Sequence, residues 1–172
     1  PDHIESKKII DSINPNKDVD GFHPFNAGLL SIGKPSFIPC TPKGIIKILD
    51  YYKINLLGKH IVVIGRSNIV GRPISILTTL KENGLNGTTT LCHSGTPNII
   101  NYTKNADVLI LALGKPKFLK ANMIKKGSVI IDVGINRIKA NNSKGYLIVG
   151  DADIDNLGNK VSAITPVPGG VG

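Results

Sequence analysis

Short runs of apolar and β-branched residues recur along the chain from residue 60 onward. They do not alternate cleanly with polar residues, which is typical of strands buried on both faces of a parallel sheet. Between them, residues 70–82 favour a helix, and a short polar helix is expected before Val108. This alternation predicts an α/β fold with a doubly wound, Rossmann-like parallel sheet. The predicted strands cover residues 60–65, 88–92, 108–112, 128–133 and 161–164.

The first third of the chain has a different pattern. Residues 4–13 have the spacing of an amphipathic helix, which the Asn-Pro-Asn sequence at 14–16 should end. A loop rich in glycine and proline is expected over residues 18–39. A second helix should then begin with Thr41 as its N-cap and Pro42 as its first residue.

Composition and charge narrow the possible partners. Hydrophobic residues make up 41% of the 172 positions, and no apolar run approaches the roughly 20 residues that span a bilayer. The formal charge of +9 suits either nucleic acid or small anions. Because the lysines are dispersed and aromatic residues are only 5%, stacking platforms for bases are scarce. We therefore expect a small anionic ligand, and neither nucleic acid nor a membrane.

Cysteine usage points to a reducing compartment. Cys40 and Cys92 make no disulfide framework, and no zinc-type spacing accompanies them. There is no signal peptide pattern at the amino terminus. A cytoplasmic location without a bound metal is the expectation.

The turn after the first predicted strand, residues 65–73, reads GRSNIVGRP. In a Rossmann unit this turn faces the phosphates of a nucleotide, because glycine lets the backbone approach the ligand. The spacing is not that of the common G-x-G-x-x-G fingerprint. A tight strand-to-helix turn that binds nothing is the alternative.

The end of the second predicted strand bears on the choice of nucleotide. Sites selective for NAD usually place Asp or Glu there, whereas this chain has Cys92-His93-Ser94. Arg66 and Ser94 could bind a 2′-phosphate, which favours NADP. His93 could equally be a packing residue, and Cys92 a small core residue.

Three further segments follow predicted strands at the carboxyl edge of the sheet, where such folds bind ligands. Gly114 and Gly134 each follow a strand there, although either could be a simple turn. Residues 165–172 read TPVPGGVG, and the two prolines argue against a flexible tail.

Seven motifs, taken together and in order, are similar to those of the methylenetetrahydrofolate dehydrogenase/cyclohydrolase family. The resemblance covers almost the whole chain, and it is the combination that is specific. The motifs are DVDG at 18–21, NAG at 26–28, PCTPKG at 39–44, the turn at 65–71, CHS at 92–94, DVGIN at 132–136 and PVPGGVG at 166–172.

The resemblance implies oxidation of 5,10-methylenetetrahydrofolate by NADP⁺ and hydrolysis of the product to 10-formyltetrahydrofolate. It implies tetrahydrofolate derivatives as substrates and a homodimer. Asp20 would be the candidate catalytic residue and would bind the pterin ring. Contacts to NADP would come from Gly65, Arg66, Ser67, Ser94 and Ile135, and the folate cleft would be lined by Pro168, Gly169, Gly170, Val171 and Gly172.

The resemblance also implies a domain division. Residues 1–53 would end an amino-terminal catalytic domain, residues 54–164 would form the NADP-binding domain, and residues 165–172 would begin the return to the first domain. Remnants of a second α/β folate-binding domain are thus expected at both ends. The family's Tyr-x-x-x-Lys motif, which carries its catalytic lysine, does not occur in the chain. We therefore expect a longer parent enzyme.

Two other interpretations of the sequence remain open. The chain could belong to an NADP-dependent dehydrogenase of another small substrate, or it could be a nucleotide-binding module without activity. The Asp20 loop and the terminal Pro-Gly-Gly loop favour the folate enzymes, because both lie outside the nucleotide core.

Overall fold

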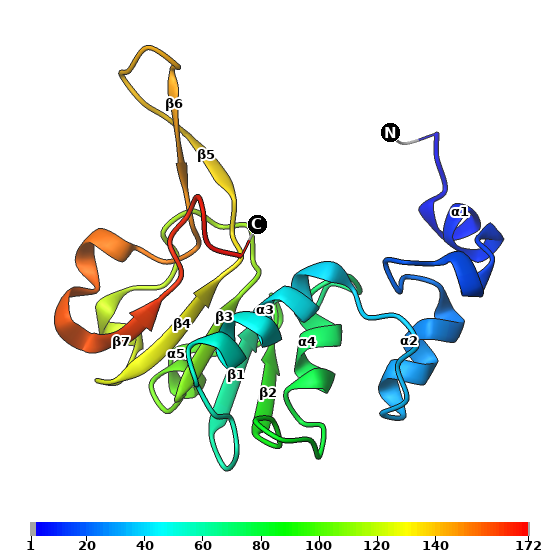
Figure 1. The fold of residues 1–172 in the computed structure, drawn as a ribbon. Helices are drawn as coiled ribbons and strands as arrows, with labels where there is room; N and C mark the ends of the chain where they lie inside the picture. Colours follow the sequence, from blue (N-terminus) through cyan, green and yellow to red (C-terminus); the bar gives the residue numbers. More distant parts are fainter. Residues whose placement is uncertain (1–2, 172) are drawn as a thin grey trace.

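A sheet of five parallel strands forms the centre of the computed structural model, which describes residues 3–171. The strand order is β2-β1-β3-β4-β7 (Figure 1). The first strand, β1, therefore lies inside the sheet, with β2 added on one side of it and β3, β4 and β7 on the other. The predicted doubly wound α/β fold is confirmed. The strands are β1 (His60–Ile64), β2 (Thr88–Cys92), β3 (Val108–Leu111), β4 (Ser128–Asp132) and β7 (Val161–Ile164).

Alternate side chains of β1 enter two different hydrophobic clusters. Ile61 and Val63 pack on one face of the sheet, whereas Val62 and Ile64 pack on the other. This double burial explains the continuous apolar runs of the central strands. The edge strands β2 and β7 are only partly buried, which is why threonine, serine and alanine are accommodated there.

Helices cover both faces. On one face α3 (Cys40–Tyr51) and α4 (Gly71–Leu77) pack over the sheet (Figure 1). The other carries α5 (Ile100–Thr103) and short 3₁₀ turns at Ala121–Met123, Ile154–Asn156 and Gly158–Lys160.

Two predicted helix boundaries are wrong. The helix expected over residues 70–82 ends at Leu77, where the hydroxyl of Thr78 donates to the carbonyl of Ile74 at 2.9 Å. The second concerns α3, which begins at Cys40 with Pro39 as its N-cap, so Thr41 does not cap it.

The amino-terminal part lies to one side of the sheet, beyond α4 (Figure 1). It contains α1 (Ser6–Ser12), a 3₁₀ turn at Pro15–Lys17 and α2 (Pro24–Ser31). The first helix was predicted, but the loop expected over residues 18–39 is wrong because α2 interrupts it. Pro24 is the first residue of α2, and Nδ1 of His23 caps it by accepting from the N–H of Phe25 at 3.1 Å.

An antiparallel hairpin, β5 (Asn136–Lys139) with β6 (Tyr146–Val149), projects beyond the sheet (Figure 1). This hairpin was not among the elements predicted from the sequence. The guanidinium of Arg137 lies 5.0 Å from the ring centroid of Tyr146 across this hairpin. Among residues 3–171, no helix has the length and apolar character needed to cross a membrane.

Candidate functional site

A cavity of about 410 Å³ opens where β1, β2 and β3 end. Because parallel strands end at the same edge, their following loops meet there, at the point where the strand order reverses. The volume is in the range of small-molecule sites. The lining residues are Ile64, Gly65, Arg66, His93, Ser94, Thr96, Ile99, Ala112, Leu113, Lys115 and Phe118.

The turn after β1 can be built only from glycine at two positions. A side chain at Gly65, where φ is +120°, would collide with the carbonyl of Ala112 at the end of β3. A side chain at Gly71 would collide with the carbonyl of Gly65. These close approaches place the start of α4 directly on the turn and leave Arg66 exposed at the rim of the cavity.

Ser67 has a structural role within this turn. Its Oγ accepts from the N–H of Val70 at 3.1 Å and from the N–H of Gly71 at 3.3 Å. Ser67 does not line the cavity. Its hydroxyl proton is not used by either contact, so the side chain can still donate to a ligand.

The loop after β2 is held by its own hydrogen bonds. The N–H of His93 donates to Oγ1 of Thr96 at 2.9 Å, and Nδ1 of His93 accepts from the N–H of Gly95 at 3.1 Å. Ser94 is exposed between them and lines the cavity. Cys92 is fully buried, and this burial raises the pKa of its thiol, so it is a core residue.

The cavity wall carries cations and no carboxylate. Arg66 and Lys115 line it, whereas Asp and Glu do not. Neither cation forms an ion pair with another described residue. Such a wall attracts anions and does not repel a phosphate.

The segment at the end of β4 also lies at the carboxyl edge of the sheet, and it contains Asp132 and Ile135. Ile135 is 67% exposed and does not line the cavity between β1 and β3. Asp132, at the end of β4, is buried and accepts from the N–H groups of Gly134, Asp151 and Ala152. Burial raises the pKa of Asp132, although these hydrogen bonds oppose the effect.

The loop after β7 lines a separate cavity of about 410 Å³ against α3. Pro166, Gly169 and Gly170 contribute to it, together with Tyr52. Of the segment predicted to bind folate, Pro168 to Val171 are described, and Gly172 lies outside the described residues. The structure therefore brings these residues to the carboxyl edge of the sheet, but not into the cavity that contains Arg66.

Two aspartates in the 18–21 segment have different roles. Asp18 is buried and accepts from the N–H groups of Phe22 and His23 and from the amide of Asn26. Burial raises its pKa, but these hydrogen bonds outweigh that and lower it. Asp20 is exposed, and its Oδ1 accepts a long hydrogen bond from Sγ of Cys40 at 3.9 Å. Asp18 thus holds the turn and leaves the Asp20 carboxylate accessible.

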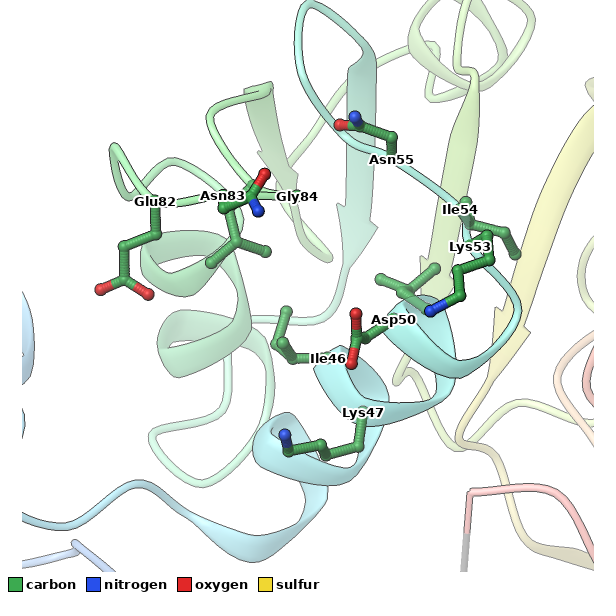
Figure 2. A pocket seen from close by; sticks show the side chains of 11 residues that line it. Ile46, Lys47, Asp50, Lys53, Ile54, Asn55, Glu82, Asn83 and Gly84 are labelled. Carbon is green, nitrogen blue, oxygen red and sulfur yellow. The ribbon is translucent and has the colours of Figure 1, made fainter.

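A larger hollow of about 450 Å³ lies between α3 and the segment before β2. Figure 2 shows Lys47 and Asp50 of α3 across from Glu82 and Asn83. All four side chains are exposed, and the charges are of both signs. None of the sequence motifs falls there, and within residues 3–171 no group of His, Cys, Asp or Glu could hold a metal ion.

Comparison with known proteins places this geometry in a family. The sequence profile described as tetrahydrofolate dehydrogenase/cyclohydrolase, NAD(P)-binding domain, matches residues 39–172. The chain belongs to the tetrahydrofolate dehydrogenase/cyclohydrolase family. The bifunctional protein FolD of Flavobacterium johnsoniae is 56% identical over 173 residues, covering 100% of this chain and 59% of that protein.

Solved structures of this family have the same fold as this chain. The bifunctional FolD methylenetetrahydrofolate dehydrogenase/cyclohydrolase from Campylobacter jejuni is 47% identical, with a TM-score of 0.90 over 99% of this chain and 58% of that one. The dehydrogenase-cyclohydrolase of Trypanosoma brucei, complexed with NADP cofactor and inhibitor, is 34% identical, with a TM-score of 0.90 at 99% and 58% coverage. The chain therefore spans less than two thirds of the length of these relatives.

Three buried aspartates of this tetrahydrofolate dehydrogenase/cyclohydrolase domain were not predicted to have a role. Each of them accepts hydrogen bonds from several N–H groups. Asp18 binds the turn that contains Asp20, Asp151 binds the loop after β3, and Asp132 binds the segment that contains Asp151. Asp18 and Asp132 stood within quoted motifs but received no role. Only the Gly-Asp-Ala-Asp sequence at 150–153, directly after an apolar run, marks the third.

Proposed function

We propose that this chain forms the NADP-binding part of an enzyme that oxidises 5,10-methylenetetrahydrofolate and hydrolyses the product. The observation that carries the proposal is the carboxylate-free cavity at the end of β1, with Arg66 and Ser94 on its wall. An arginine and a hydroxyl suit a 2′-phosphate, and the absence of a carboxylate on this wall leaves nothing there to repel it. Family membership supports the same assignment.

The turn from Gly65 to Gly71 supports the fit of a dinucleotide. Glycine at these two positions lets the start of α4 pack directly against the end of β1, and Gly65 lies on the wall of the cavity, where the backbone of the turn can face a phosphate. In the proposed site Gly65, Arg66 and Ser94 contact the adenosine half, and Ser67 donates its remaining proton. Ile135, exposed beside the end of β4, contacts the other half.

Two reactions follow from the proposal. Held by Gly65, Arg66 and Ser94, NADP⁺ would supply a hydride acceptor, and transfer of a hydride from the methylene carbon would leave the 5,10-methenyl cation and NADPH. Water then adds to that cation, a proton is lost, and ring opening gives 10-formyltetrahydrofolate. The protein's part is to hold the carbon against the nicotinamide, and such positioning can contribute several kcal/mol.

The folate side of the site rests on two segments. Asp20 is exposed and its carboxylate only accepts hydrogen bonds, which suits the amide and amino groups of a pterin. The other part of the proposed cleft would come from the segment after β7, that is Pro168, Gly169, Gly170, Val171 and Gly172. In this arrangement residues 54–164 are the nucleotide domain, with residues 1–53 and 165–172 belonging to the folate side.

The assignment can be tested by titrating NADP and NAD into the purified chain in a calorimeter. NADP should bind at least tenfold more tightly than NAD, because only NADP has the 2′-phosphate that Arg66 and Ser94 would hold. Equal affinities, or no binding of either nucleotide, would refute the proposed site.

A homodimer in the cytoplasm completes the proposal. The hairpin β5–β6 projects from the sheet with Leu147 half exposed, and it offers unpaired strand edges for a second copy. Cys40 and Cys92 are free thiols, as expected in a reducing compartment. Light scattering coupled to size exclusion would measure the mass, and a monomer at micromolar concentration would contradict the dimer.

A further inference from the structure

Asp151 lies two residues after β6 and is fully buried, yet its carboxylate receives four hydrogen bonds from two other segments. Its Oδ2 accepts from the N–H of Leu113 at 2.7 Å and of Gly114 at 3.0 Å. Its Oδ1 accepts from the N–H of Lys115 and from Nδ2 of Asn136, both at 2.9 Å. One side chain thus ties the loop after β3 to the start of β5.

The loop after β3 is shaped to receive an anion. Gly114 has a φ of +67°, and the N–H groups of residues 113–115 converge on one point. Successive N–H groups arranged in this way form a concave anion site. Here the anion is the protein's own carboxylate. These three N–H groups are therefore engaged by Asp151, and Lys115 is the residue of this segment whose side chain can still offer a charge to a phosphate.

Asp151 is itself fixed from behind. Its N–H donates to Oδ1 of Asp132 at 3.0 Å, and the next N–H, of Ala152, donates to Oδ2 at 2.8 Å. A side chain at Gly134 would collide with the Asp151 carboxylate. The end of β4 therefore sets the position of Asp151, and Asp151 sets the position of the loop after β3.

The loop held in this way forms one wall of the nucleotide cavity, to which Ala112, Leu113 and Lys115 all contribute. We propose that Asp151 is a positioning residue for nucleotide binding, which fixes this wall and the base of the Lys115 side chain. The inference rests on the proposed NADP site. Asp151 itself does not line the cavity, so it acts through the loop and not through contact with the ligand.

The test compares Asp151→Asn with a matched carboxylate at the opposite end of the sheet. Asp107 accepts from the N–H of His60 and from Nζ of Lys125, and it does not line the cavity. In Asp151→Asn an amide NH₂ replaces one acceptor oxygen, so at least one loop N–H loses its partner. We expect its NADP dissociation constant to rise tenfold or more by calorimetry, and that of Asp107→Asn to change less than twofold.

A second pair of variants, at two glycines, tests the inference if Asp151→Asn does not fold. Gly114 and Gly58 have φ of +67° and +69°, and a Cβ at either meets nothing within 4 Å. Alanine at either position carries similar backbone strain. Gly114→Ala disturbs the loop that Asp151 holds and should weaken NADP binding at least threefold, whereas Gly58→Ala should leave it unchanged.

Hydrogen exchange without nucleotide separates this inference from the proposed function. In Asp151→Asn the amides of residues 113–115 should exchange at least tenfold faster than in the wild type, and slowly exchanging amides of β1 should not differ from those of Asp107→Asn. If the wild type bound no NADP, the proposed function would fail while the exchange result still tested the anchoring of the loop. A folded Asp151→Asn with wild-type NADP affinity, or with unchanged exchange in the loop, would overturn the inference.

Discussion

Replacing Arg66 with alanine should abolish most of the preference for NADP over NAD. Arg66 is exposed on the cavity wall and forms no ion pair with a described residue, so its charge is available to a ligand. NAD lacks the 2′-phosphate and should bind wild type and variant equally. The variant therefore changes one affinity and not the other.

The size of the effect follows from the exposure of the site. Two unit charges at about 4 Å attract by about 1 kcal/mol in water and about 4 kcal/mol at an effective dielectric constant of 20. The rim lies between these limits, and hydrogen bonds between charged groups contribute about 1.5–3 kcal/mol. We expect the loss of Arg66 to weaken NADP binding by about one to two powers of ten.

Calorimetric titration of both nucleotides at low and moderate salt would measure this. Arg137→Ala is the matched control, because Arg137 is exposed on the hairpin and does not line the cavity. The difference between wild type and Arg66→Ala should shrink as salt rises. An Arg66→Ala variant that lost NAD affinity as strongly as NADP affinity would show that Arg66 shapes the turn instead of binding the phosphate.

Three further predictions concern other parts of the chain. In an active form of the enzyme, Asp20→Ala should lower both activities about ten- to a hundredfold with NADP affinity nearly unchanged, while Asp11→Ala does neither; a parallel loss of NADP affinity would contradict the folate role. Hydrogen bonding from Lys125, and then from the His60 N–H, lowers the pKa of Asp107. The ionised Asp107 carboxylate therefore stabilises the fold above the ordinary pKa of about 3.9, and this stabilisation is lost as pH falls through the lowered pKa. Lys125→Met should therefore lower the free energy of unfolding by about 0.2–1 kcal/mol at pH 7 and leave it unchanged near pH 2, and a difference that persisted in acid would point to packing. Assayed alone, these 172 residues should bind NADP but form no methenyl product detectable by absorbance, because the family's lysine motif does not occur in them; turnover would reveal a catalytic amine that we have not identified.

The central strands could be predicted from sequence because burial on both faces favours a continuous apolar run, which residues 61–64 of β1, 108–111 of β3 and 129–131 of β4 provide. The hairpin β5–β6 was missed because β5 consists of Asn, Arg, Ile and Lys and so lacks an apolar run, although its partner β6 is apolar. Helix α2 was missed because glycine and proline suggested a loop. Its Pro24 in fact stands at the first helical position, where proline is well accommodated.

The candidate site was predictable where backbone geometry demands a residue type. Gly65 and Gly71 admit no side chain, so the sequence marks the turn, and Ser94 follows from its place after β2. Lys115 was not predicted as a lining residue, because the sequence does not say where a loop lysine points. Ser67 was predicted to contact NADP, and its capping contacts depend on the exact path of the turn.

The charge of Asp151 gives the positioning inference its sharpest test, because geometry and electrostatics act in opposite directions on NADP binding. Over a separation on the order of 10 Å, the carboxylate would repel a phosphate charge by about 0.4–1.7 kcal/mol for dielectric constants of 80 to 20. Asp151→Asn removes this repulsion, so electrostatics alone would tighten NADP binding, most strongly at low salt. The loop, however, loses an acceptor for a buried N–H group, and its wall of the cavity is no longer fixed. If positioning dominates, as we infer, Asp151→Asn binds NADP more weakly than wild type at every salt concentration, and tighter binding at low salt would show that the charge matters more than the loop.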